Sequence, residues 1–453
     1  MNVRDDAREI FIAGVGRVDP GLLLSHVLRL EGLSLRVHQA QGDFVYDLDG
    51  YRHILAVGMG KASAVLARGL EEIVGDRLDE GFVVTKAVDG VVCSKIRLVQ
   101  GGHPVPDARS AAAGAEILAL AHKARAWEAS GERTLVVVLV SGGGSALMSA
   151  PVSGISLKDK AAVTRLLLGS GATIKEMNVV RKHLSAIKGG RLVEAFAPST
   201  ILSLVLSDVV GDDLDAIASG PTVPDASTWE AAQAVLIGRG VWEAVPESVR
   251  KLFGEAAKGE RPETPKPGSS VFANVRTVLV GNNMLALESA EKEAKRRGYN
   301  CLLLTSRLEG EAREVAKLFL ALAGDIDCCG RPLGRPACIL SGGETTVTLR
   351  GKGLGGRNQE MALAFLSGLK SGLSGHGDLI FLSAGTDGND GPTDAAGAFA
   401  STELAERASS LGLDPEAFLA DNDSWHFFDK TGGLFRTGST GTNVCDMQIL
   451  LLP

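Results

Sequence analysis

Residues 134–145 read TLVVVLVSGGGS, and this stretch decides the fold class. Residues 134–140 form a short apolar run rich in valine, and a glycine-rich loop follows directly. The run is too short to cross a membrane and is closed by glycines, which is typical of a fully buried strand in a parallel sheet. The same order of apolar run and glycine-rich or acidic turn recurs at 54–57, 201–206, 277–280 and 379–382.

Helix-like segments follow several of these turns, and strands that alternate with helices predict an α/β protein. We expect an N-terminal, Rossmann-like lobe with a doubly wound parallel sheet, whose ligands bind beyond the carboxyl ends of the strands. Residues 339–349 predict a hairpin, which indicates a mixed sheet in a second α/β lobe. The polar segment 259–270 (GERPETPKPGSS) predicts a linker, so that the lobes span 1–258 and 271–453.

The composition excludes several classes of protein. Hydrophobic residues make up 45% of the 453 positions and charged residues 22%, as in a folded globular chain rather than a disordered one. The net charge of −7 provides no overall basic field for nucleic acid. The six cysteines lack the spacing of a zinc site, and neither a signal peptide nor a membrane span is apparent. We therefore expect a cytoplasmic protein.

Two glycine-rich turns are candidate anion sites. Residues 57–63 read VGMGKAS, which fits neither the Walker spacing nor GxGxxG, because Ser63 stands at the third glycine. Lys61 at the start of a helix opposes the helix dipole, which makes sense if an anion binds there. Residues 141–145 (SGGGS) offer unobstructed backbone N–H groups for phosphate. The alternatives are a tight turn with a solvated lysine and a glycine turn required for packing.

Charged residues complete the pattern. Residues 171–192 predict one helix with a capping box and a basic face that includes Arg181 and Lys188; the alternative is a solvated face. Asp208 follows a predicted strand and Asp387 lies in an acidic turn, where Mg²⁺ on nucleotide phosphates is commonly held. The alternative for these acids is helix capping. Arg357 opens a helix after glycines and can grip phosphate or carboxylate.

The motifs together resemble the class II glycerate kinases, the glycerate 2-kinase family with a C-terminal MOFRL domain. The resemblance covers nearly the whole chain, and the motifs that carry it are GMGKA (58–62), GGHPVPD (101–107), SGGGSAL (141–147), NVVRKHLSAIKGGRL (178–192), LSDVVGDD (206–213), IASGPTVPD (217–225), SGGETTV (341–347), GGRNQE (355–360) and GTDGNDGPTDAAGA (385–398). Ser439 and Cys445 stand where the family usually has proline and asparagine, which leaves the detail of that loop open.

The resemblance implies ATP-dependent phosphorylation of D-glycerate at its 2-hydroxyl, with Mg²⁺, in a cleft between two lobes. It implies a MOFRL domain at about 336–446, catalytic roles for Lys61, Arg357 and Asp208, and metal binding by Asp208 and Asp387. The substrate- and phosphate-binding residues that we expect are Gly58, Gly60, Ser141, Gly142, Gly143, Gly144, Ser145, Arg181, Lys188, Asn283, Glu344 and Asn358. ATP and D-glycerate are the expected partners, and a homodimer is possible.

Two other functions stay open at this point. An NAD(P)-dependent hydroxypyruvate reductase would need a dinucleotide loop, but residues 58–63 lack the third glycine and the next strand ends in Lys86 instead of the ribose-binding acid. A sugar-phosphate sensor could use residues 141–145 alone and would not need the acidic loops. Release of ADP from ATP, Mg²⁺ and D-glycerate would distinguish all three.

Overall fold

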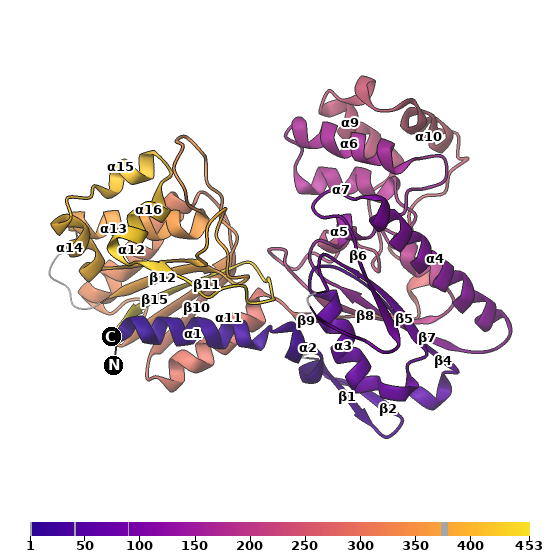
Figure 1. Cartoon of the computed structure of the whole chain (residues 1–453), viewed down its shortest axis with the longest axis horizontal. Coiled ribbons are helices and arrows are strands. Elements are labelled where there is room, and N and C mark those ends of the chain that lie inside the picture. The colour runs from indigo at the N-terminus through magenta and orange to yellow at the C-terminus, as the bar shows by residue number, and fades with distance from the viewer. Residues whose placement is uncertain (1, 40–41, 89, 373–378) are drawn as a thin grey trace. The chain divides into compact units, whose positions relative to one another are not determined.

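The computed structural model describes residues 2–39, 42–88, 90–372 and 379–453, and the chain forms two compact units (Figure 1). The N-terminal unit is Pro20–Val280. The C-terminal unit is Gly281–Pro453 together with the residues up to Asp19. The α/β class and the two predicted lobes are therefore confirmed, whereas the boundaries differ from the prediction.

A six-stranded sheet forms the centre of the N-terminal unit, in the order β6-β5-β4-β7-β8-β9. The pairs β4–β5, β5–β6, β4–β7 and β7–β8 are parallel, as expected. Every residue of β7 is buried, which explains its continuous apolar sequence. The strands are β4 (His53–Met59), β5 (Glu80–Thr85), β6 (Ile96–Gln100), β7 (Thr134–Val140), β8 (Thr200–Leu206) and β9 (Val275–Gly281).

Helices cover this sheet on both sides, as in a doubly wound fold. Alternate residues of β4, such as Leu55 and Val57, share one hydrophobic core with α4 (Ala108–Ala129) and α8 (Arg191–Phe196). The helix α3 (Ser63–Val74) packs on the sheet outside that core, together with α2 (Pro20–Val27). A small antiparallel sheet precedes β4 and contains β1 (Leu28–Glu31), β2 (Ser34–Val37) and β3 (Phe44–Asp47).

A second hydrophobic core joins four helices that extend the N-terminal unit (Figure 1). Side chains such as Val163, Val180 and Leu252 interdigitate there. The start of α7 is fixed by a capping box between Thr173 and Glu176, as the sequence predicts. The helices are α6 (Leu157–Gly169), α7 (Ile174–His183), α9 (Trp229–Gly238) and α10 (Glu247–Ala257). The short helix α5 (Gly144–Leu147) follows β7 directly in the chain.

The C-terminal unit contains a mixed six-stranded sheet in the order β10-β11-β15-β12-β13-β14. Only β10–β11 is a parallel pair among its described pairings. The strands are β10 (Asn300–Leu308), β11 (Ala337–Gly343), β12 (Ile380–Gly385), β13 (Gly397–Ser401), β14 (Leu434–Phe435) and β15 (Asp446–Leu452). The helices are α11 (Asn283–Arg296), α12 (Ala312–Cys329), α13 (Arg357–Gly372), α14 (Thr402–Ser410), α15 (Pro415–Ala420) and α16 (Ser424–Thr431).

The first helix of the chain, α1 (Val3–Arg17), belongs to this C-terminal unit and lies along α11 (Figure 1). Gly14 lies so close to Met447 and the Ala286 carbonyl that a Cβ would reach within 2.5 Å of Met447 Cε. Asp6 is buried and accepts hydrogen bonds from Arg297 at 2.5 Å and from the Tyr299 hydroxyl at 2.9 Å. The polar and apolar contacts together dock α1 on this unit.

The predicted linker at 259–270 is wrong. Thr264 is buried and its hydroxyl donates to Asp225 at 2.9 Å, and the backbone N–H of Asp225 donates to the Pro265 carbonyl at 2.9 Å. The prolines and glycines shape a packed strap of the N-terminal unit. The change of unit falls after β9, an apolar strand with no linker composition, and the domain limits 1–258 and 271–453 are corrected accordingly.

Two predicted elements also differ. The single helix expected at 171–192 ends at His183, because the chain turns at Gly189 and Gly190, both with positive φ, before α8 begins. The hairpin expected at 339–349 does not form. Instead β11 pairs with β15 in an antiparallel register, Ala337 opposite Leu452 and Gly343 opposite Asp446.

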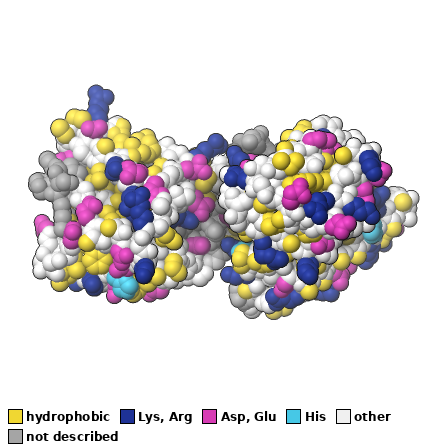
Figure 2. Space-filling model, turned by 90° about the horizontal axis from the view of Figure 1, so that it is seen from above, with side chains coloured by type: hydrophobic (Ala, Val, Ile, Leu, Met, Phe, Trp, Pro, Cys, Tyr) yellow, Lys and Arg dark blue, Asp and Glu magenta, His cyan; other side chains and the backbone are white. Residues whose placement is uncertain are grey.

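The molecular surface shown in Figure 2 carries Lys and Arg side chains interspersed with Asp and Glu. Over the described ranges, no single helix is long and apolar enough to cross a membrane; only α1 and α2 taken together, across a bend, reach that length and composition.

Candidate functional site

Three predicted motifs of the N-terminal unit meet at one edge of its sheet. The strands β4, β7 and β8 are adjacent and parallel, so their carboxyl ends lie side by side. The residues that follow these strands are Lys61, the glycine-rich loop 141–145 and Asp208. The sequence prediction that these motifs form one site is consistent with this geometry.

The glycines of this site allow a close approach of side chains and backbone. A Cβ on Gly60 would overlap Ser141, and one on Gly142 would overlap the Asp208 carboxylate. A Cβ on Gly143 would lie 3.0 Å from the His103 ring and 3.3 Å from Lys61 Cγ. Gly142 and Gly143 are therefore required for packing, and they also place His103, Lys61 and Asp208 around one loop.

The charges at this edge act on one another. Lys61 is exposed, and its side chain makes no hydrogen bond or ion pair with the described residues. Burial raises the pKa of Asp208, and the positive charge of Lys61 opposes that shift. Burial lowers the pKa of His103, and the nearby cations Lys61 and Lys86 lower it further. Lys61 is thus a cation available to a bound anion.

The two serines of the glycine-rich loop have protein partners. The Ser141 hydroxyl oxygen accepts a hydrogen bond from the Ala62 N–H at 3.1 Å and lies 3.1 Å from the Ser63 hydroxyl, so it caps the start of α3. The Ser145 hydroxyl lies 2.7 Å from that of Ser219. The ligand role predicted for these two hydroxyls stays a prediction; that of Gly58 does too.

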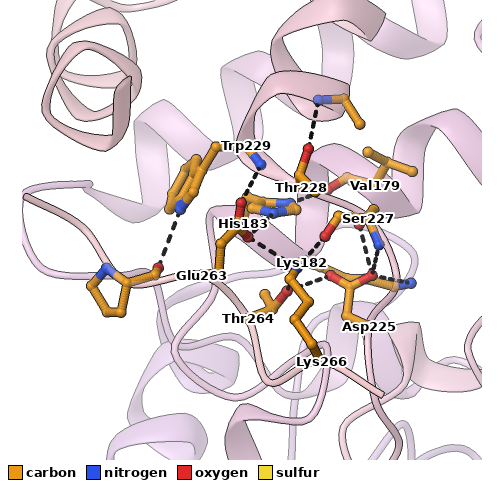
Figure 3. Close-up of polar contacts among 12 residues, drawn as sticks. Val179, Lys182, His183, Asp225, Ser227, Thr228, Trp229, Glu263, Thr264 and Lys266 are labelled. Atoms are coloured by element: carbon orange, nitrogen blue, oxygen red, sulfur yellow. Dashed lines mark hydrogen bonds and ion pairs between the residues drawn. The ribbon is translucent and has the colours of Figure 1, made fainter. Parts of the chain in front are cut away.

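The basic residues expected on a helix face are buried rather than solvated. Lys182 forms ion pairs with Asp215 and with Asp225, and Arg191 donates to the Ser185 carbonyl at 2.7 Å. Figure 3 shows the network around Lys182 and Asp225, which also joins His183 to Glu263. These contacts tie α7 to the strap at 262–266 and are structural. The alternative of a solvated face is wrong for this cluster.

In the C-terminal unit, the register of β15 places Asp446 at the edge of the sheet where β11 and β12 end. Asp446 lies opposite Gly343 at the end of β11 and opposite Gly385 at the end of β12. Arg357, at the start of α13, donates from Nε and Nη2 to the two oxygens of Asp446 at 2.6 and 2.9 Å. Its Nη1 lies 2.7 Å from Glu344. The planar fork predicted to grip substrate is therefore occupied by Asp446, because that carboxylate is fully buried and needs a partner.

A polar pocket of about 530 Å³ opens beside this pair. Glu344, Arg357 and Asp387, three residues that the sequence analysis selects, line it together with Asp390. Burial raises the pKa of Asp390 to about 7, although the N–H groups of Gln359 and Asn358 donate to its carboxylate and oppose the shift. Burial also raises the pKa of Asp446, against the effect of Arg357.

Two predicted binding residues hold the fold of this unit. The amide nitrogen of Asn283 donates to the Val444 carbonyl at 2.8 Å and to the Asp446 carbonyl at 2.9 Å. Asn358 is fully buried, and its amide oxygen accepts from the Ser383 hydroxyl at 2.6 Å. Their amides thus serve the sheet and the start of α13, and a ligand contact for them stays a prediction.

The comparisons with known proteins cover the whole chain. A family described as "Domain of unknown function (DUF4147)" matches residues 6–254, and the MOFRL family matches residues 337–446. A glycerate 2-kinase from Pyrococcus horikoshii is 38% identical over 99% of this chain and 98% of its own length. A solved glycerate kinase from Thermotoga maritima superimposes with a TM-score of 0.84 at 36% identity, over 100% of this chain and 99% of that one.

The chain belongs to the class II glycerate kinase family. Another relative, from Agrobacterium vitis, is named putative hydroxypyruvate reductase. It is 42% identical over 100% of this chain and 95% of its own length. The MOFRL match begins and ends within one residue of the predicted limits.

Within this family member, Lys61 and Asp208 lie in one unit and Arg357 and Asp387 in the other. A shared cleft therefore stays a prediction. Over the described residues, no group of three or more His, Cys, Asp and Glu is placed to hold a metal ion alone. Mg²⁺ in kinases is usually held by one or two carboxylates and by substrate phosphates, so single carboxylates at Asp208 or Asp387 fit its chemistry.

Sequence reasoning missed several residues of both sites. His103 lies within the GGHPVPD motif, whose presence could have suggested it. Asp446 stands at the start of the antiparallel strand β15. The rule that ligands bind beyond the carboxyl ends of parallel strands does not predict a site residue at such a position. Ser219 lies within the IASGPTVPD motif at 217–225, but its contact with Ser145 arises from tertiary packing.

Proposed function

We propose that this chain is an ATP-dependent glycerate 2-kinase, which transfers a phosphoryl group to the 2-hydroxyl of D-glycerate with Mg²⁺. The observation that carries the proposal is the exposed ammonium of Lys61, without a protein partner among the described residues, beside Asp208 and a glycine-rich loop. The similarity to glycerate 2-kinases over the whole chain supports the same reaction.

Each residue has a role that follows from its surroundings. Lys61 neutralises negative charge that develops on the transferred phosphoryl group. The backbone of residues 142–144, free of Cβ atoms, allows phosphate oxygens to approach its N–H groups. Asp208 is buried next to Lys61, whose positive charge favours the ionised carboxylate, so Asp208 orients the reacting groups by charge. When bound, Mg²⁺ neutralises phosphate charge and fixes the phosphates for in-line transfer.

In the C-terminal unit we propose that Arg357 acts mainly through Asp446 and Glu344, by holding the shape of the polar pocket. Asp387 lines that pocket, and it remains our proposed second carboxylate for the metal. Cytoplasmic location and a homodimer also remain proposals.

The reductase alternative has less support from the site. The loop after β4 reads GKAS at 60–63, and Lys86 follows β5 where a dinucleotide fold has an acid for the ribose. A sensor would not require an exposed lysine beside a buried carboxylate.

One assay separates these functions. The purified chain is mixed with ATP, Mg²⁺ and D-glycerate, ADP is measured, and the product is identified by ³¹P NMR, which distinguishes 2- from 3-phosphoglycerate. A parallel reaction contains NADH or NADPH and hydroxypyruvate. Formation of 2-phosphoglycerate without oxidation of the dinucleotide is expected. Oxidation without ADP would support a reductase, and glycerate binding without either reaction would support a sensor.

The substitution Lys61→Met tests the residue that carries the proposal. We expect the turnover rate to fall on the order of 10²–10³-fold, because charge on the phosphoryl group is no longer neutralised. The melting temperature should be unchanged, since Lys61 is exposed and unpaired within the described part of the chain. Lys258→Met, at an exposed position after α10, is the matched control. Near-normal turnover of Lys61→Met would contradict the assignment.

A further inference from the structure

Three basic residues of the N-terminal unit act on one another electrostatically, and none of them forms an ion pair with a described residue. Lys160 comes from α6, Arg181 from α7 and Lys188 from the turn after α7. Lys160 and Lys188 are 5% and 1% exposed, so their ammonium groups are shielded from bulk water. The Lys160 ammonium donates only to the Ser149 hydroxyl, at 3.4 Å, among its described contacts.

The other two members are equally poorly satisfied. The Lys188 ammonium donates to the Ala218 carbonyl at 3.2 Å, which leaves two of its three N–H bonds without an acceptor among the described residues. Arg181 is partly buried, and none of the described residues offers its guanidinium a hydrogen bond or an ion pair. Each of these three side chains therefore has N–H donors without an acceptor among the described residues.

The neighbouring cations show that the fold neutralises buried charge where it needs to. Lys182, 1% exposed and on the same helix, is paired with Asp215 and Asp225 (Figure 3). Arg191 donates to backbone carbonyls. A buried lysine whose ammonium lacks acceptors either destabilises the folded state or loses its proton, so the retention of Lys160 and Lys188 needs another reason.

The electrostatic effects place the three groups near enough to act on one another's charge. Burial lowers the pKa of Lys160 to about 7, and the positive charge of Arg181 lowers it further. Burial lowers the pKa of Lys188 well below its usual value, and both Lys160 and Arg181 add to that effect. Each positive charge thus disfavours the protonated form of its neighbours, and a bound oxyanion would favour that form.

Backbone strain connects this cluster to the glycine-rich loop. Ala218, whose carbonyl accepts from Lys188, has φ 51°, and Ser219 has φ 61°, both in the left-handed region. The Ser219 hydroxyl donates to Asn178 at 3.0 Å and lies 2.7 Å from the Ser145 hydroxyl. Strain of this kind persists where the surrounding contacts fix it, and it is concentrated at functional sites.

We propose that Lys160, Arg181 and Lys188 form the subsite that binds the carboxylate of the acceptor substrate. This inference rests on the proposed function, which requires an acceptor that is a carboxylate anion. An arginine fork matches the two oxygens of a carboxylate, and the two lysines offer it further N–H donors. The nucleotide phosphates are the other source of an oxyanion, and the experiment separates the two.

The test is thermal unfolding of the full chain with D-glycerate, ATP or inorganic phosphate added singly. Lys160→Met and Lys188→Met replace a buried ammonium by an apolar side chain of similar length. Without ligand, both variants should melt at a higher temperature than the wild type, because each removes a buried polar group that has too few hydrogen-bond acceptors. The rise in melting temperature on adding glycerate should be lost, and the rise with ATP should be kept. By calorimetry, glycerate affinity should fall at least about tenfold.

Lys182→Met is the matched control, since it removes an equally buried but paired lysine. It should lower the melting temperature and keep the glycerate-induced rise. Arg181→Gln, at a partly exposed position, keeps the test valid if a methionine variant fails to fold, and it should also lose the glycerate response.

The outcomes separate the two hypotheses. Methionine variants that keep the glycerate response overturn the carboxylate subsite, and variants that instead lose the ATP or phosphate response assign the cluster to phosphate. A wild type that binds glycerate but forms no phosphorylated product contradicts the proposed kinase, while the subsite is still read from binding alone.

Discussion

At the scale of single residues, two glycines of the 141–145 loop face functional side chains: Gly142 faces the Asp208 carboxylate and Gly143 faces the His103 ring. Gly142→Ala should lower activity by about 10²-fold or more, since its Cβ would displace the Asp208 carboxylate from its place beside Lys61. Steady-state turnover of glycerate measures this effect.

Gly254→Ala is the control for that substitution. Gly254 lies within α10, and a Cβ there would have no heavy atom within 4 Å. We expect unchanged turnover and a gain of about 0.5–1 kcal/mol in the free energy of unfolding, because alanine is the better helix former. Equal activity of both variants would remove Gly142 from the site.

Arg357 carries the second prediction at this scale. Arg357→Lys keeps the charge but loses the two-point contact with the buried Asp446. The free energy of unfolding should therefore fall by about 1–3 kcal/mol, measured in urea. From the sequence, Arg357 is expected to grip phosphate or carboxylate, whereas in the structure its fork holds Asp446.

Arg436→Lys supplies the comparison for Arg357. Arg436 pairs with Asp394 and Asp429 at the surface, where ion pairs contribute about 0–1 kcal/mol. If the two lysine variants are equally stable, the pair of Arg357 and Asp446 does not hold the pocket.

At the scale of elements, the start of α13 depends on Asp390, a residue more than thirty positions downstream. The folded protein holds the Asp390 proton up to about pH 7, whereas the unfolded chain releases it near pH 4. The wild type should therefore lose stability relative to Asp390→Asn as the pH rises from about 4 to 7, with a constant difference above that range. Melting temperatures at steps of pH measure the slope.

Asp394→Asn should give a slope of opposite sign in acid. The pKa of Asp394 is lowered by its hydrogen bond with Arg436, so its ionised form stabilises the fold and the contribution is lost as pH falls. A flat difference for Asp390→Asn would show that its carboxyl group titrates normally.

The elements also show what a sequence can predict here. The rule that ligand loops follow parallel strands located Lys61, Asp208 and the 141–145 loop, because short-range pattern and sheet direction determine them. The sequence did not predict Asp446 as a site residue, because its position depends on the insertion of β15 between β11 and β12, and this long-range pairing has no local sequence signal. The basic cluster at 181–191 was recognised, but a pattern of charges cannot say that Lys182 is paired and Lys188 is not.

At the scale of the whole molecule, the unit boundary predicts which fragments fold. Residues 281–453 alone lack α1, and so lack Phe11, which packs edge-on against Phe435 with ring centroids 5.2 Å apart. That fragment should be unstable or aggregate, and a peptide of residues 2–19 added in trans should raise its melting temperature. Residues 20–280 should unfold cooperatively on their own. A stable 281–453 fragment that ignores the peptide would contradict the docking of α1.

The docking of α1 also has a consequence for synthesis on the ribosome. The hydroxyl of Thr442 donates to the carbonyl of Val18, a partner 424 positions earlier in the chain. At about 5–20 residues per second, α1 waits roughly 20–80 seconds after it leaves the exit tunnel before this contact can form. During that time the apolar side of α1, with Ile10 and Phe11, is uncovered. The N-terminal unit (Pro20–Val280) lies between the two segments of the C-terminal unit in the sequence, and it completes its own fold in this interval. The nascent chain therefore exposes an aggregation-prone N-terminal helix, which we expect chaperones to cover until translation finishes.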